Sequence, residues 1–353
     1  PNELLYKQKR FRFIAMRNLC VQGSVGTIAV IAALSGAGIY ALLINPIVSS
    51  IVLFIVNLRE HPLRVRWTAG LQPLRTIFAF SAYQFSFNVI NYFTRNLDKL
   101  LIGKYMGMSP LGYYEKSYRL MMLPLQNITQ VITPVMHPIF SDYQDDLERL
   151  ASGYERIVRF LAFIGLPLSV LLYFTAGEVT LIIFGDQWTP SIPVFRILTL
   201  SVGVQIILSS SGSIFQAAGD TKNLFMCGLF SSILNVTGIL LGIFWFGTLE
   251  AVATCITLTF TVNFAQCYWM MYRMTLHRSL RHFAIQLISP LMVSILLIAV
   301  LYPLSLMTEG GNIFLTLIVK SIIFFCIFGC YIQLTGEYDI TGKAKSIINK
   351  NKR

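Results

Sequence analysis

Ten apolar stretches, each with few or no charged residues, follow one another along the chain. About 20 consecutive apolar residues are enough for one helix to cross a bilayer. Lipid offers no partners for backbone N–H and C=O groups, so a stretch that spans a membrane in this way is helical. The sequence therefore predicts an all-α integral membrane protein with about ten transmembrane helices. The stretches are Asn18–Ile39, Tyr40–Leu58, Thr76–Thr94, Leu120–Phe140, Phe160–Gly177, Ile197–Gly219, Asn223–Leu249, Ala251–Tyr272, Phe283–Thr308 and Ile313–Gly336.

The amino-acid composition agrees with this prediction. Hydrophobic residues make up 55% of the chain and charged residues 12%, whereas a soluble domain averages about 25% charged residues. All six cysteines lie within apolar stretches, where a small hydrophobic side chain is their usual role. They have no histidine or carboxylate neighbours, so we expect neither a metal site nor a disulfide framework.

Basic residues indicate the orientation of the helices. If the N-terminal arm is cytoplasmic, most of the 28 lysines and arginines fall in that arm, in alternate loops and in the C-terminal tail. This distribution obeys the positive-inside rule and predicts that both termini are cytoplasmic. The formal net charge of +12 follows from this topology, so it gives no reason to expect a nucleic-acid partner.

A polar stripe runs along the third apolar stretch and continues just beyond it. Its members are spaced three or four residues apart, so they lie on one face of one helix. The other faces carry aromatic and aliphatic side chains. A membrane helix with this pattern is expected to turn its polar face to a cavity. The stripe consists of Ser81, Gln84, Asn88, Asn91, Arg95 and Asp98.

Polar residues also recur at helical spacing in three other apolar stretches. Two interpretations stay open for them: they line the same cavity, or they form hydrogen bonds between helices that are worth about 0.6 kcal/mol per contact. The candidates for the cavity are Gln126, Gln130, Gln205 and Gln216. Helical spacing also places threonines, Asn263 and Gln266 in the stretch Ala251–Tyr272.

Three charged residues, Arg95, Asp98 and Lys99, stand at the outer end of the stripe. A charge near the middle of a bilayer costs at least about 2.5 kcal/mol on insertion scales. One interpretation is a purely structural role, in which Asp98 forms an ion pair with Arg95 or Lys99. The other is a cavity wall that binds an anionic substrate or a coupling ion. Lys320 has the same two interpretations, whereas Arg196 is expected to extend to the interface.

The longest inside connection, residues 141–159, has an amphipathic pattern. Leu147, Leu150, Tyr154 and Ile157 fall on one face, and acidic residues fall elsewhere. We interpret it as a helix at the membrane interface that connects the fourth and fifth apolar stretches.

Several short motifs, in this order and spacing, resemble the Wzx-like polysaccharide flippases of O-antigen, capsule and colanic-acid type. These belong to the multidrug/oligosaccharidyl-lipid/polysaccharide (MOP) exporter superfamily. The resemblance is most specific between Phe85 and Lys222, and the helix pattern extends it to the whole chain. The motifs are Asn96–Gly103, Leu111–Tyr114, Tyr118–Leu120 with Pro124, Pro138–Ser141, Phe184–Trp188, Pro193–Leu198 and Gln216–Lys222.

The resemblance implies a transporter of two six-helix lobes around a central cavity. Mapped onto this chain, it assigns residues 1–58 to a basic arm and the last two helices of the first lobe. Residues 59–76 are then a cytoplasmic linker between the lobes, 77–272 the complete second lobe, 273–336 two additional helices and 337–353 a basic cytoplasmic tail. On this mapping the first four helices of the family are missing, and we expect the chain to be part of a longer protein.

The implied function is flipping of a polyprenyl-pyrophosphate-linked oligosaccharide across the bacterial inner membrane by alternating access. The implied partners are an undecaprenyl-pyrophosphate-linked glycan, membrane lipids and polysaccharide polymerase machinery. Candidates for the substrate cavity are Gln84, Asn88, Asn91, Arg95, Asp98, Lys99, Gln126, Gln130, Gln205 and Gln216. Asp98 is also the candidate for coupling to Na⁺ or H⁺, and no other cofactor, catalytic residue or metal ligand is expected.

Two alternatives stay open. A lipid II flippase or multidrug antiporter of the same superfamily would differ mainly in the first lobe. A membrane glycan ligase or glycosyltransferase would need catalytic groups in sizeable loops, and the predicted outside loops are short. Asp142, Asp145 and Asp146 form an acidic cluster inside, but neither a histidine nor a glycine-rich phosphate loop accompanies it.

Overall fold

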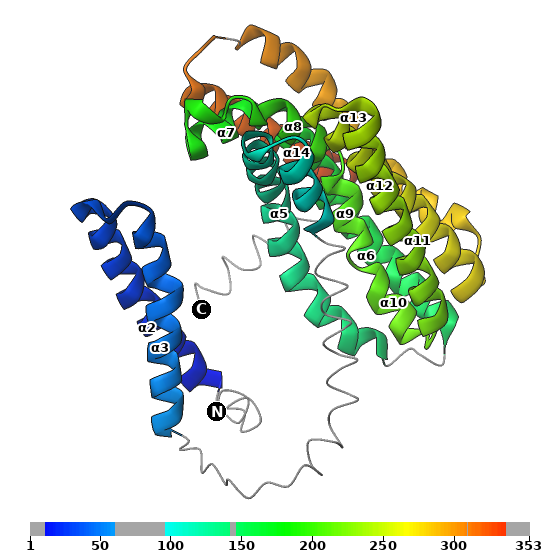
Figure 1. Cartoon of the computed structure of the whole chain (residues 1–353). Helices are drawn as coiled ribbons and strands as arrows, with labels where there is room; N and C mark the ends of the chain where they lie inside the picture. The colour runs from blue at the N-terminus through cyan, green and yellow to red at the C-terminus, as the bar shows by residue number, and fades with distance from the viewer. Residues whose placement is uncertain (1–10, 61–95, 142–145, 309, 337–353) are drawn as a thin grey trace, which may run out of the picture. The chain divides into compact units, whose positions relative to one another are not determined.

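The computed structural model describes residues 11–60, 96–141, 146–308 and 310–336. These residues form helices that belong to two compact units, residues 1–85 and 86–353 (Figure 1). The third apolar stretch, Thr76–Thr94, lies outside the described residues. The other nine stretches are helical, which confirms the prediction of an all-α membrane protein.

The first unit contains two helices that run side by side, α2 (Phe11–Ala32) and α3 (Ala41–Glu60). Two short helical turns, η1 (Ala33–Ala37) and η2 (Gly38–Tyr40), join them. Gly36 and Gly38 have positive φ angles of 89° and 54°, which glycine adopts without steric penalty. The chain can therefore reverse its direction within a few residues.

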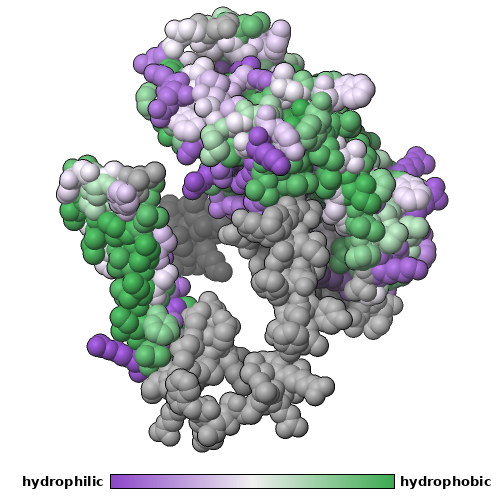
Figure 2. Space-filling model, in the orientation of Figure 1, coloured by the Kyte–Doolittle hydropathy of each residue, from purple (hydrophilic) through white to green (hydrophobic). Residues whose placement is uncertain are grey.

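Hydrogen bonds of Arg17 connect α2 and α3 near the end of the pair that lies away from the η1–η2 turn. The Arg17 guanidinium donates to the side-chain oxygens of Asn57 and Asn18. Large apolar side chains such as Leu34 and Phe54 are exposed elsewhere on the pair. Figure 2 shows these hydrophobic residues as a green surface along the pair, with hydrophilic residues near one end. Such a surface suits contact with lipid.

The described part of the second unit begins with the helical residues 96–105, and five of its later helices start at polar caps. The side chains of Asp146, Asp220, Thr248, Ser279 and Asn312 accept hydrogen bonds from backbone amides in the first turn of the helix that follows each of them. The remaining elements are α5 (Met108–Ser141), α6 (Leu147–Phe174), α7 (Ala176–Phe184), η3 (Asp186–Trp188), α8 (Ser191–Thr199), α9 (Val202–Leu208), α10 (Ser211–Ala217), α11 (Thr221–Leu240), η4 (Leu241–Phe246), α12 (Leu249–Met270), η5 (Met271–Thr275), α13 (Leu280–Met307) and α14 (Ile313–Thr335).

The predicted helix Ile197–Gly219 is broken into pieces in the structure. Helix α8 meets the segment Val202–Ala217 at a bend of 45°. At the break, the Ser201 hydroxyl donates to the carbonyl of Leu198 at 2.7 Å, and at the next break the Ser210 hydroxyl donates to Ile207 at 2.8 Å. Hydroxyl groups that bond back to the preceding turn bend helices. Ser201 and Ser210 therefore shape this segment.

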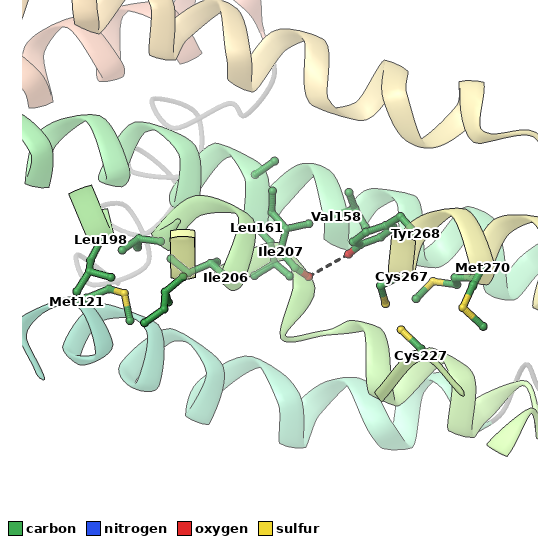
Figure 3. Close-up of a cluster of buried hydrophobic side chains, with 14 of the residues drawn as sticks. Met121, Val158, Leu161, Leu198, Ile206, Ile207, Cys227, Cys267, Tyr268 and Met270 are labelled. Atoms are coloured by element: carbon green, nitrogen blue, oxygen red, sulfur yellow. Dashed lines mark hydrogen bonds between the residues drawn. The ribbon is translucent and has the colours of Figure 1, made fainter. Parts of the chain in front are cut away.

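The core of the second unit lies around α6, which packs closely against α9 and α13. Two glycines permit the contact with α9: a Cβ atom added to Gly203 would lie 3.0 Å from the carbonyl oxygen of Gly165. Two buried tyrosines stand in this core, and their hydroxyls, on Tyr154 and Tyr268, lie 2.7 Å apart. Figure 3 shows Tyr268 donating to the carbonyl of Ile207, at 3.0 Å.

The amphipathic segment 141–159 differs from its interpretation as a separate helix at the membrane interface. From Leu147 it is the first half of α6, and it continues without a break into the apolar stretch. Leu150 and Tyr154 are fully buried. The apolar face of this segment therefore packs on the protein core, and not on lipid headgroups.

Among the described residues, seven helices are long and apolar enough to cross a membrane, and the bent pair of α8 with α9–α10 adds an eighth. Helix α5 contains the predicted stretch Leu120–Phe140 as well. The chain is a multi-pass membrane protein.

Candidate functional site

Three adjoining cavities, which we call the polar groove, lie among helices of the second unit. The first has a volume of about 610 Å³ and lies between residues 96–105, α5, α11 and α12. The second, of about 370 Å³, shares Met122, Phe260 and Asn263 with the first. The third, of about 180 Å³, shares Asn263 with both of the others. The polar residues of the first cavity are Asn96, Asp98, Lys99, Tyr118, Ser231, Ser232, Asn235, Thr259 and Asn263.

Helical spacing explains why these side chains meet. On α5, Tyr118, Met122 and Gln126 stand four residues apart and share one face of the helix. On α12 the lining positions Phe260, Asn263 and Cys267 follow at steps of three and four. Helix α11 contributes Cys227, Ser231 and Asn235 at steps of four. Three helix faces therefore form the walls of the polar groove.

Asp98 is buried, with 7% of its surface exposed, and its carboxyl group has two hydrogen-bond donors. The Tyr114 hydroxyl donates to Oδ2 at 2.7 Å, and the backbone N–H of Lys99 donates to Oδ1 at 2.8 Å. Tyr114 is itself fully buried in α5. Asp98 thus ties the helical residues 96–105 to α5 while it lines the first cavity.

Lys99 stands beside Asp98 but directs its ammonium group elsewhere. Nζ lies 3.1 Å from the Glu115 carboxylate and 5.9 Å from the ring centroid of Tyr118. The expected pairing of Asp98 with the Lys99 side chain is therefore replaced by a pair between Lys99 and Glu115. The other expected partner, Arg95, lies outside the described residues. Since both side chains of the observed pair are partly exposed, its contribution to stability is about 1 kcal/mol at most.

Two buried polar atoms of the second cavity have no hydrogen-bond partner among the described residues: Asn263 Oδ1 and Thr129 Oγ1. Buried polar atoms are almost always hydrogen-bonded to protein or to water. Both atoms therefore keep hydrogen-bonding capacity that none of the described residues uses.

Some of the predicted cavity residues line a cavity in the structure, one does not, and others lie outside the described residues. Asp98 and Lys99 line the first cavity, and Gln126 and Gln205 line the second. Gln205 also donates to the Ser201 hydroxyl at 2.8 Å. Gln216 is exposed on α10 and lines none of the cavities found among the described residues. Outside what the structure describes are Gln84, Asn88, Asn91, Arg95 and the side chain of Gln130.

Asn263 borders all three cavities but was not among the predicted cavity residues. Its helical spacing with threonines was visible in the sequence, but spacing alone does not show which face of α12 meets the cavity. Asn235 on α11 was missed as well, although it stands four residues after Ser231 at helical spacing.

Comparisons with known proteins agree with this architecture. Residues 1–193 match the family described as polysaccharide biosynthesis protein. The chain is 26% identical over 183 residues to the teichuronic acid biosynthesis protein TuaB of Bacillus subtilis, covering 50% of this chain and 38% of TuaB. It is 25% identical over 231 residues to the lipopolysaccharide biosynthesis protein WzxC of Escherichia coli, covering 65% of this chain and 47% of WzxC.

A third relative is the succinoglycan biosynthesis transport protein ExoT of Rhizobium meliloti, 26% identical over 243 residues, with 68% of this chain and 48% of ExoT covered. The chain therefore spans about half the length of the curated relatives it matches, or less. Among solved structures, the lipid II flippase MurJ in an inward closed conformation matches with a TM-score of 0.71 and 14% identity. The match covers 90% of this chain and 66% of MurJ, so the two share a fold.

Proposed function

The chain belongs to the family of polysaccharide biosynthesis proteins, and on that premise we propose that it is part of a flippase for lipid-linked oligosaccharide. The substrate class is an oligosaccharide joined to a polyprenyl pyrophosphate such as undecaprenyl pyrophosphate. It moves from the inner to the outer leaflet of the bacterial inner membrane, for assembly of a surface polysaccharide. The observation that carries this proposal is the polar groove, which lies inside a bundle of membrane-spanning helices.

The chemistry of the groove suits each part of such a substrate. Sugar hydroxyls both donate and accept hydrogen bonds, and Asn235, Asn263 and Gln126 present amide groups that do the same. A pyrophosphate group needs cations, and Lys99 supplies one at the wall of the first cavity. The polyprenyl chain is apolar and can stay in the bilayer while the polar head passes through the groove.

Asp98 is the proposed site of coupling to Na⁺ or H⁺. Its carboxyl group faces the first cavity and already accepts hydrogen bonds from Tyr114 and the Lys99 backbone. A carboxyl group can bind Na⁺ or take up H⁺, so either ion can couple at this position. Loss in Asp98→Asn of the dependence of export on external Na⁺, or on the pH gradient, would identify the coupling ion, and unchanged ion dependence in this variant would overturn the assignment.

The proposed orientation puts both termini in the cytoplasm. Arg273 and Arg278 lie between α12 and α13, and Arg281 lies in the first turn of α13. Arg278 pairs with Glu155 and Glu148 near the start of α6. The positive-inside rule assigns this end of the helices to the cytoplasm. Polysaccharide polymerase machinery is then the proposed partner at the opposite side, where the flipped glycan arrives.

The proposal of a transporter rather than an enzyme is supported by the acidic cluster near residue 146. Asp146 serves there as the N-cap of α6, accepting from the backbone of Arg149 at 3.0 Å, and pairs with the Arg149 guanidinium at 3.1 Å. Asp142 and Asp145 lie outside the described residues. This structural role for Asp146 removes one of the three acidic residues on which the ligase and glycosyltransferase alternative relied.

The test is export of surface glycan in a strain that lacks the protein and is complemented by its native open reading frame. We expect Asn263→Leu to reduce export about tenfold, since a groove that hydrogen-bonds its substrate loses about 1.5 kcal/mol or more when such a partner is removed. Thr254→Val is the matched control, because Thr254 is exposed on the same helix and, among the described residues, its hydroxyl bonds only to the Glu250 carbonyl. Normal export by Asn263→Leu would contradict the proposal.

The same strains separate the two transporter alternatives. A multidrug antiporter would change resistance to cationic drugs and leave the surface glycan unchanged. A lipid II flippase would be required for growth in strains that make no surface polysaccharide.

A further inference from the structure

A fourth cavity, which we call the α14 cavity, lies where the ends of α6 and α13 meet α7 and the start of α14. Its volume is about 420 Å³. The residues that decide its chemistry are Tyr173, Glu178, Arg196, Tyr302, Thr316 and Lys320. None of its lining residues lines the polar groove, so its contents are separate from the proposed substrate path.

Lys320 stands at the buried wall of the α14 cavity, with 4% of its surface exposed. Its ammonium group forms an ion pair with Glu178 and donates to the carbonyl of Phe174 at 2.8 Å. An ammonium group has three N–H donors, and the third has no partner among the described residues. Glu178 is thereby neutralised, and one donor of Lys320 is left for a ligand.

Arg196 supplies a second cation to the same cavity. Its guanidinium lies 5.7 Å from the ring centroid of Tyr173, which holds the group over an aromatic face. Within the part of the chain that the structure describes, Arg196 forms neither a hydrogen bond nor an ion pair. Its five N–H donors are therefore available, and among the described lining residues the two cations, Lys320 and Arg196, exceed the one anion, Glu178, by one charge. Glu309, which follows Thr308 in the sequence, is outside the described residues.

The surroundings of the α14 cavity point to an amphiphile. Thr316 and Tyr302 add hydroxyl groups to its lining, and Leu306 in the lining exposes an apolar side chain. Phe314 and Leu315, which lie between the lining residues Ile313 and Thr316 in the sequence, are exposed as well. The cavity stands at the end of α13 opposite the basic linker that precedes Leu280. Under the positive-inside rule this end is at the outer membrane–water interface, where headgroup phosphates lie.

We propose that the α14 cavity binds the phosphate group of an anionic phosphate ester, with Arg196 as the principal contact and Lys320 and Thr316 as further donors. A planar guanidinium that binds phosphate oxygens with two parallel hydrogen bonds is a common recognition mode. The phosphate belongs either to a lipid headgroup, whose acyl chains would then lie on the exposed apolar residues of the lining and of the start of α14, or to a soluble ester. The inference does not rest on the proposed flippase activity.

The experiment is native mass spectrometry of the full chain in detergent, titrated with phosphatidylglycerol. We expect one tightly bound phosphatidylglycerol, and about a tenfold weaker affinity in Arg196→Gln because hydrogen bonds to a charged partner are lost. Arg196→Lys keeps the positive charge and should bind more tightly than Arg196→Gln. Arg119→Gln is the matched control, since Arg119 is exposed on α5 and lines none of the cavities described here.

Two further probes identify the source of the phosphate. Diacylglycerol, which lacks phosphate, should not compete for the site. Competition by inorganic phosphate would support a soluble ester, and binding of phosphatidylglycerol that inorganic phosphate does not displace would support a lipid. The proposal is overturned if Arg196→Gln binds phosphatidylglycerol as the unmodified chain does, if Arg119→Gln loses as much affinity, or if diacylglycerol competes equally.

Discussion

The hydroxyl group of Tyr114 donates a 2.7 Å hydrogen bond to the carboxyl group of Asp98, and both residues are buried. This contact joins the helical residues 96–105 to α5 at the wall of the first cavity. It gives Asp98 a fixed position while one side of the residue faces the groove. Asp98 therefore joins two helices through Tyr114 and also lines a cavity, while its role toward a substrate or a coupling ion stays a prediction.

We expect Tyr114→Phe to destabilise the protein by about 1.5 kcal/mol or more, because the buried carboxyl group loses a donor and water does not replace it. The measurement is thermal unfolding in detergent. Tyr113→Phe is the control, since Tyr113 is the neighbouring tyrosine and its hydroxyl has no hydrogen bond among the described residues, although its ring contacts Trp188. Equal destabilisation by the two substitutions would show that the hydrogen bond to Asp98 contributes nothing specific.

A second prediction concerns the close approach of α6 and α9. A methyl group on Gly203 would stand 2.8 Å from Leu166 Cδ2 and 3.0 Å from the backbone oxygen of Gly165. We expect Gly203→Ala to destabilise the fold by about 1–3 kcal/mol, as overpacking in a tight core does. Gly212→Ala, with no atom within 4 Å of the added Cβ, should leave the unfolding temperature nearly unchanged. A normal unfolding temperature for Gly203→Ala would mean that the two helices do not meet at these glycines.

A third prediction concerns pH. Asp220 caps α11 through the backbone of Asn223 and accepts a 2.7 Å hydrogen bond from the Thr275 hydroxyl. Burial raises the pKa of its carboxyl group, but the hydrogen bonds from Thr275 and Asn223 outweigh burial, so the pKa lies below its ordinary value. The stabilisation is therefore fully present above the unfolded pKa of about 3.9 and is lost as the pH falls through the lower folded pKa.

We expect the unmodified chain to be more stable than Asp220→Asn at pH 7, and the difference in unfolding temperature to shrink below about pH 4. Asp220→Ala also loses the helix cap and should be less stable at every pH, by about 1 kcal/mol. A difference between the unmodified chain and Asp220→Asn that is the same at pH 7 and pH 3 would argue against an ionised carboxylate in this role.

The helices were predictable because length and apolarity are local properties of a membrane segment. The amphipathic part of α6 was misplaced because its apolar face fits a core and an interface equally well by composition. The break after Thr199 was not predicted, since serines that bond back to the preceding turn have the same spacing as serines that line a cavity.

The candidate site was predicted in part, because spacing identifies the face of a helix but not its neighbour. Lys99 and Gln126 proved to face cavities, whereas Gln216, on equally regular spacing, is exposed. The partner of Asp98 was sought among adjacent residues on its own helix. The true donor, Tyr114, follows 16 residues later on the next helix, and only the tertiary structure brings the two together.

The central claim, that the polar groove carries an anionic lipid-linked glycan, is tested most directly by comparing the two members of the Lys99–Glu115 pair. The measurement is surface-glycan export in the complemented strain, with protein levels matched. We expect Lys99→Gln to reduce export about tenfold, since the pyrophosphate loses a charge-assisted hydrogen bond. Glu115→Gln should leave export within about twofold, because the exposed ion pair itself contributes little. Equal losses in both variants, or normal export by Lys99→Gln, would contradict the account.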